Sequence, residues 1–171
     1  MHRIVRTLAL AMFGAACGDG GFEPSQTITN GSPAGSTTIA GTVNANVSGE
    51  QFAGRLSTGA TLRNQRFSFS AYDGNIRQIA ISVRIPGPGT FDTGGPYSPV
   101  VSLIEGFGPD LLRWTSVPEP GAGTLTLDFI SAESANGHFS FHLEPDSATR
   151  AAGVTTSRSV TSGTFNVTMS R

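Results

Sequence analysis

The chain has 171 residues, a formal net charge of −1 and only 13% charged residues, and all of its basic residues other than histidine are arginine. This length predicts one domain with appended segments, and the charge does not provide the clustered basic face of a nucleic-acid-binding protein. A single cysteine excludes an internal disulfide, so the fold must depend on its hydrophobic core.

Residues 1–16 have the features of a secretory signal peptide. The basic start MHRIVR is followed by the apolar run TLALAMFGAA, in which small residues at Gly14 and Ala16 precede Cys17. The apolar run is about 10 residues long, whereas a membrane-spanning helix needs roughly 20. The pattern predicts cleavage before Cys17 and export from the cytoplasm.

The sequence Gly14-Ala15-Ala16-Cys17 resembles the lipobox of bacterial lipoproteins, with Gly14 where that family prefers Leu, Val or Ile. In that family the cysteine thiol receives a diacylglyceryl group, the chain is cut before the cysteine, and the new amine is acylated, for example with palmitate. The resemblance implies that Cys17 is a lipid attachment site. The protein would then be anchored in the bacterial cell envelope, facing the periplasm or the exterior. The alternative is a secreted protein with a free thiol, which is a liability in an oxidising compartment.

Residues 17–36 are rich in Gly, Ser, Pro and Thr and show no periodicity of 2 or 3.6. This composition is typical of a flexible linker. We therefore divide the chain into a signal peptide (1–16), a lipidated cysteine with its linker (17–36) and a folded domain (37–171).

From residue 37 onward the sequence alternates between apolar and polar residues. The clearest alternation places Ile79, Ile81 and Val83 on one face, and similar runs lie near residues 37–49, 67–71, 125–129, 139–143 and 165–169. Turn signals separate these runs at 72–75, 86–89, 118–121 and 135–137. The pattern predicts an all-β domain, an antiparallel β-sandwich of eight to ten strands, with a closed up-and-down β-barrel as the alternative. Because the runs place bulky residues on one face only, we expect a filled core.

The segments PGTFDTGG, GAGTLTLDFI, GHFSFHLE and VTSGTFNVTM resemble a family of uncharacterised bacterial lipoprotein domains. That family's pattern ends in G-x-F-x-F and, about twenty residues later, a G-x-F-x-V strand. The resemblance implies a β-sandwich on a lipid tether. It brings no established activity and no catalytic residues.

Three residues are candidates for ligand binding. Asp92 and Tyr97 lie in a connection rich in Gly and Pro, where binding residues are frequently found, although a plain turn is the alternative. Trp114 is either a core residue or an aromatic platform, and its size favours the core.

The remaining polar residues give no pattern of a catalytic or metal site. His138 and His142 are four residues apart on a predicted strand, which is too far for one metal, and they should face away from Phe139 and Phe141. Outward arginines on the early strands, at positions 55, 63, 66, 77 and 84, are interpreted as charges that blunt sheet edges.

These observations favour a lipid-anchored, extracytoplasmic module with a binding or structural role and no cofactor. Its partners would be the membrane, through the anchor, and an envelope protein or a glycan, but not nucleic acid. Two alternatives remain open, a hydrolase of envelope or extracellular polymers and a barrel that carries an apolar ligand. The first would place His, Asp and Ser in one cleft, and the second would enclose a large apolar cavity.

Overall fold

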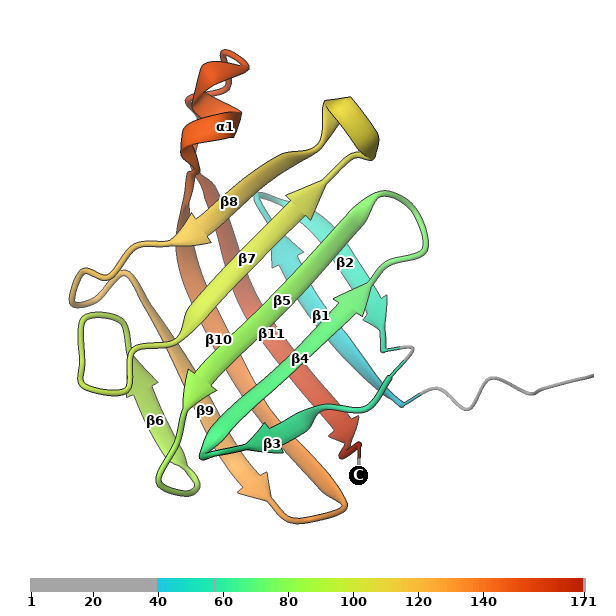
Figure 1. Cartoon of the computed structure of the whole chain (residues 1–171), viewed down its shortest axis with the longest axis vertical. Coiled ribbons are helices and arrows are strands. Elements are labelled where there is room, and N and C mark those ends of the chain that lie inside the picture. The colour runs from blue at the N-terminus through green and yellow to red at the C-terminus, as the bar shows by residue number, and fades with distance from the viewer. Residues whose placement is uncertain (1–39, 57, 171) are drawn as a thin grey trace, which may run out of the picture. The chain divides into compact units, whose positions relative to one another are not determined.

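The computed structural model describes residues 40–56 and 58–170, which belong to a compact unit spanning Ser36–Arg171. The segments predicted as signal peptide, lipidated Cys17 and linker lie outside the described residues. Eleven strands dominate this unit, joined by one short 3₁₀ helix (Gly108–Asp110) and one short α-helix, α1 (Ser147–Ala151) (Figure 1). The strands are β1 (Gly41–Val47), β2 (Glu50–Arg55), β3 (Thr61–Arg63), β4 (Arg66–Tyr72), β5 (Arg77–Arg84), β6 (Gly89–Asp92), β7 (Val100–Glu105), β8 (Leu112–Ser116), β9 (Gly123–Ile130), β10 (Ser134–Pro145) and β11 (Arg158–Thr168).

Eight of the strands close into an antiparallel, up-and-down barrel. The order of hydrogen-bonded neighbours is β1-β2-β4-β5-β7-β8-β10-β11, and β11 pairs with β1 to complete the ring. The prediction of an antiparallel all-β domain is confirmed. Of the two forms that the sequence left open, the structure has the closed barrel. The remaining strands are additions, because β3 pairs with the edge of β4, whereas β9 pairs with the first part of β10 and carries β6 on its other side.

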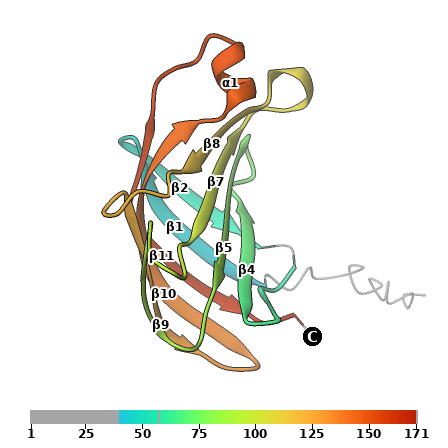
Figure 2. The same ribbon diagram turned by 60° about the vertical axis from the view of Figure 1, so that its left-hand side comes forward.

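The core lies between two layers of strands that cross at a steep angle. In Figure 1, β4, β5 and β7 pass in front of β9, β10 and β11, and Figure 2 shows the two layers from the side. Inward residues are apolar and almost fully buried, including Ile79, Ile81 and Val83 on β5 as the alternation predicted. This closed barrel contains the whole hydrophobic core. The unit therefore has the core of its own that allows a domain to fold by itself.

Phenylalanine rings fill the interior by lying over glycines of the neighbouring strand. Phe139 is the cross-strand partner of Gly163, and Phe165 is that of Gly137. A Cβ atom added to Gly163 would lie 2.5 Å from ring carbons of Phe139, and one added to Gly137 would lie 2.8 Å from the Phe165 ring. Neighbouring rings complete the layer, with Phe69 and Phe165 centroids 5.0 Å apart. The barrel interior is therefore occupied by the chain's own side chains, as expected for a filled core.

One predicted turn is wrong. The Ala135-Asn136-Gly137 signal lies inside β10, and the chain reverses at Ser131–Ser134 instead, where the Ser131 amide donates to the Ser134 carbonyl. Gly137 is needed in the strand because a Cβ atom there would collide with the Thr126 carbonyl oxygen on β9 and would also lie against the Phe165 ring on β11. Both neighbours come from other strands, so the local sequence alone mimics a turn.

Candidate binding surface

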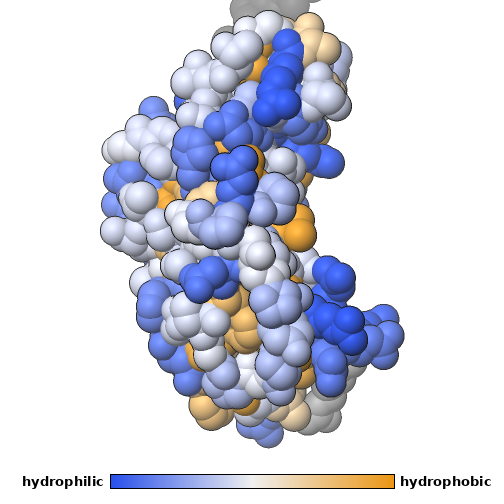
Figure 3. Space-filling view, turned by 90° about the vertical axis from the view of Figure 1, so that its left-hand side faces the viewer, coloured by the Kyte–Doolittle hydropathy of each residue, from blue (hydrophilic) through white to orange (hydrophobic). Residues whose placement is uncertain are grey.

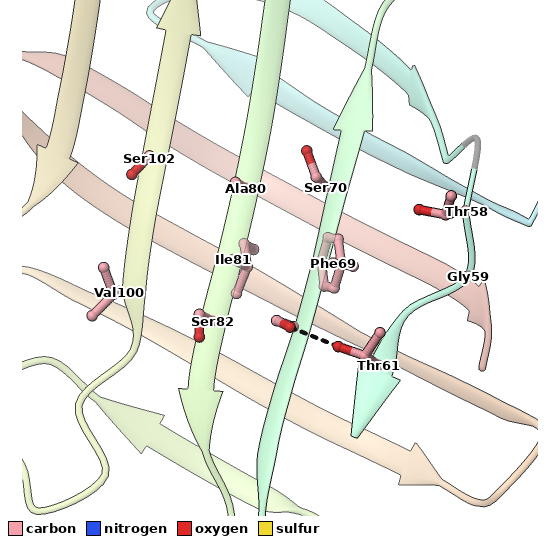
Figure 4. A pocket seen from close by; sticks show the side chains of 11 residues that line it. Thr58, Gly59, Thr61, Phe69, Ser70, Ala80, Ile81, Ser82, Val100 and Ser102 are labelled. Carbon is pink, nitrogen blue, oxygen red and sulfur yellow. Dashed lines mark hydrogen bonds between the residues drawn. The ribbon is translucent and has the colours of Figure 1, made fainter. Parts of the chain in front are cut away.

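The outward face of β3, β4, β5 and β7 is hollowed and covered with small hydroxyl side chains. Register places Thr61, Ser68 and Ser82 in one row across three strands. The next row along the strands contains Ser70, Ala80 and Ser102. A depression of about 370 Å³ lies over these two rows, and the same side of the molecule is concave in profile (Figure 3). We call this depression the outer groove. Its lining residues are Thr58, Gly59, Thr61, Ser68, Phe69, Ser70, Ala80, Ile81, Ser82, Val100 and Ser102 (Figure 4).

Hydrogen bonds between neighbouring strands hold the groove's side chains in place. The hydroxyls of Thr61 and Ser68 are 2.9 Å apart (Figure 4), and the Gln78 amide donates to the Ser70 hydroxyl. A hydroxyl has one donor and two lone pairs, so each of these groups keeps capacity for a ligand. The outer groove thus presents several fixed donors and acceptors on a surface that small residues keep open.

An exposed aromatic pair lies at one end of this face. Tyr72 points outward on β4 in the row beyond Ser70, and its ring centroid is 6.4 Å from that of Phe107. The two residues are 39% and 60% exposed. The Tyr72 hydroxyl is fixed by donating to the carbonyl of Asn75. Exposed aromatic rings beside fixed polar groups are a common composition of binding surfaces.

Three arginines form a row at the opposite end. Arg63 lies opposite Arg66 across β3 and β4, and Arg66 lies opposite Arg84 across β4 and β5. All three are exposed, and within residues 40–56 and 58–170 none forms an ion pair. Like charges directly opposite each other destabilise a sheet. The sequence-based interpretation as edge charges does not account for this row, because β4 and β5 each have neighbours on both sides.

The ligand-binding candidates from the sequence lie away from the groove's lining. Asp92 ends β6 and is exposed, and Tyr97 packs its ring edge-on against Phe91 with centroids 6.5 Å apart. Trp114 is fully buried in the core, where its indole N–H donates to the Thr156 carbonyl at 2.8 Å. Cys17 lies outside the described residues. Asp92 and Tyr97 thus share one short connection, and Trp114 lies apart from them in the core.

The two strand histidines point outward, as the alternation predicted. His138 Nδ1 is 3.3 Å from an Asp128 carboxylate oxygen, and His142 Nε2 is 2.9 Å from a Glu144 oxygen. Both pairs are about half exposed to solvent. Across the described part of the chain, His, Cys, Asp and Glu side chains do not gather in any group of three that could hold a metal ion.

An ion network supports the loops at the barrel end that carries Tyr72. Arg77 donates to Asp73 at 2.8 Å and to Glu50 at 3.3 Å, and its guanidinium lies over the Phe52 ring. Burial acts to raise the pKa of the Asp73 carboxyl. Hydrogen bonds from the Arg77 side chain and from the Asn75 and Arg77 amides outweigh it and hold that pKa below its ordinary value of 3.8. This network fixes the loop that accepts the Tyr72 hydroxyl.

A search with family models and comparisons with curated proteins and with solved structures found no match. Within the described residues, no helix has both the length and the apolar character needed to cross a bilayer.

Proposed function

We propose that the protein is a lipid-anchored, extracytoplasmic binding module of the bacterial cell envelope, and that its barrel binds a polysaccharide in the outer groove. The observation that carries the proposal is the fixed array of hydroxyls on a concave sheet surface, with an exposed aromatic pair at its end. The anchor at Cys17 is supported by the signal peptide and lipobox pattern of residues 1–17.

A polysaccharide matches this surface in chemistry and in extent. Sugar hydroxyls donate and accept in the same way as Ser and Thr hydroxyls, so two rows of hydroxyls can exchange hydrogen bonds with consecutive sugars. Ala80 and Gly59 let a ligand approach the sheet closely. Tyr72 lies six residues from Arg66 along β4, or roughly 20 Å, which provides space for more than one sugar unit.

Both the filled barrel interior and the residues that line the outer groove support a binding role for the outer surface. Phe139 and Phe165 occupy the barrel interior, which leaves the outer face as the better place for a ligand. The groove's described lining consists of hydroxyl, small and apolar residues, without a histidine or carboxylate. A hydrolase would need such groups to converge on its substrate.

The proposal is tested by affinity electrophoresis of residues 36–171 in gels that contain soluble xylan, mannan, β-glucan or solubilised peptidoglycan. We expect one of these polymers to retard the wild-type domain. Ala80→Arg, which places a long side chain in the middle of the groove, should abolish the retardation. The matched control is Ala53→Arg, because Ala53 also faces outward on a strand but lies outside the groove. Equal retardation of both variants would refute the groove as the binding site.

A further inference from the structure

A second depression, of about 430 Å³, opens between β3, the β9–β10 turn and the C-terminal end of β11. Its apolar members are Leu62, Ile130, Ala132 and Met169, and we call it the basal cleft. Leu62, one of these residues, is 44% exposed. Apolar side chains that gather on a surface in this way mark an interaction site.

The basal cleft lies at the end of the barrel that holds Ala40. The Thr168 amide and hydroxyl both donate to the Ala40 carbonyl at 2.8 Å, and residue 40 is the first described residue. Met169, the next residue after Thr168, forms an isolated bridge with Ala60. Ala40 thus lies at the same end of the barrel as the apolar cleft.

The arginine row borders the same end. Arg63 directly follows Leu62 on β3, and the row continues through Arg66 to Arg84. Two acidic residues lie near this end, Glu133 in the β9–β10 turn and Asp128 two residues before Ile130 on β9, and the Glu133 carbonyl accepts from the Met169 amide. Three arginines against these two carboxylates leave a positive excess at the base. Because no described carboxylate pairs with the row, its charges are available to an external anion.

We infer that the base of the barrel docks on an anionic lipid surface. The exposed Leu62 would enter the acyl boundary, with Met169 packed against the core behind it, and the arginine row would bind lipid phosphates. Membrane binding of this kind combines buried apolar area with attraction between basic residues and anionic headgroups. The apolar cleft beside the row favours a lipid surface over a soluble polyanion, which would use the charges alone. The inference requires neither lipidation of Cys17 nor binding in the groove.

The test is co-sedimentation of residues 36–171, the unit that contains the complete barrel, with vesicles of phosphatidylglycerol or of phosphatidylcholine. We expect binding to the anionic vesicles that weakens as salt is raised, and little binding to the neutral ones. Arg63→Gln combined with Arg84→Gln should lower the affinity roughly thirtyfold, about fivefold for each charge. The matched control, Arg113→Gln with Arg150→Gln, removes the same charge near α1 and should retain the wild-type affinity.

A third variant tests the apolar contribution. Leu62→Ser should weaken vesicle binding about fivefold, because a half-exposed leucine would no longer be buried in the bilayer. The inference would be overturned if the domain failed to bind phosphatidylglycerol vesicles. It would also be overturned if the variant at Arg63 and Arg84 and the control variant at Arg113 and Arg150 lost vesicle affinity equally. It would also be overturned if Leu62→Ser bound vesicles as the wild type does and the domain bound soluble dextran sulfate equally well. That result would assign the arginine row to an anionic polymer.

Discussion

Replacing Gly163 with alanine tests whether the barrel interior is as full as the structure shows. The added Cβ would lie 2.5 Å from Cδ2 and Cε2 of Phe139, distances that normal contacts do not reach. The Phe139 ring is 2% exposed, and its centroid lies 6.2 Å from that of Phe141 and 6.4 Å from that of Phe165. The ring therefore has no free space into which it can move.

Overpacking of this kind costs about 1–3 kcal/mol of folding free energy. For a unit of this size, such a loss lowers the melting temperature by roughly 4–12 °C. The measurement is thermal unfolding of residues 36–171, followed by circular dichroism. The matched control is Gly87→Ala, because a Cβ at Gly87 would meet no atom within 4 Å. We expect this variant to melt within about 2 °C of the wild type.

The reasoning is refuted if Gly163→Ala melts at the same temperature as the wild type. The Phe139 ring would then have moved into empty space, and the barrel would have room for an apolar ligand. Such a result would revive the carrier function that the alternating sequence left open. A lower melting temperature in Gly163→Ala, with no such change in Gly87→Ala, instead supports ligand binding at the outer surface.

Three further predictions concern single residues. Asp73→Asn should reduce stability by about 2 kcal/mol at pH 7, because it removes the ionised partner of Arg77. Since the pKa of Asp73 is depressed in the folded state, its contribution is complete above the unfolded-state pKa. The difference between wild type and variant, measured by urea denaturation, should therefore shrink as the pH falls from about 5 to about 2. Thr149→Val should cost about 1–3 kcal/mol and speed hydrogen exchange at the Arg113 amide, because the Thr149 hydroxyl bonds both the N–H and the C=O of Arg113. Faster exchange that extends evenly over the whole barrel would contradict this local role. Cys17→Ala should remove a diacylglyceryl mass from the mature N-terminus and let a high-salt wash, which weakens electrostatic docking, release the protein from the membrane fraction, whereas an unmodified wild-type terminus would contradict the anchor.

The strands could be predicted from the sequence because their signal is local. Ile79, Ile81 and Val83 alternate with polar residues, and the structure buries all three. Barrel closure is not a local property. It depends on β11 pairing with both β1 and β10, and a sequence with one apolar face on each strand is equally compatible with a sandwich.

The sequence alone did not reveal the outer groove, because the groove forms only when the strands pair in their particular register. Ser68, Ser70 and Ser82 are ordinary outward residues in the sequence, and they form a surface when β4 and β5 align. One signal was available for the arginine row. Asn64 and Gln65 both have positive φ in the two-residue turn between β3 and β4, and a hairpin over Arg63-Asn64-Gln65-Arg66 places the two arginines opposite each other.

The most direct test of the central claim is an NMR titration of the ¹⁵N-labelled domain with fragments of the polysaccharide that retards it most in the gel. The account predicts that amide shifts concentrate on the groove strands, at Ser68, Ser70, Ser82 and Ser102, and remain small at His138 and Thr164 on the far outer face. Shifts centred instead on the interior residues Phe139 and Phe165, or spread evenly around the barrel, would contradict binding in the outer groove.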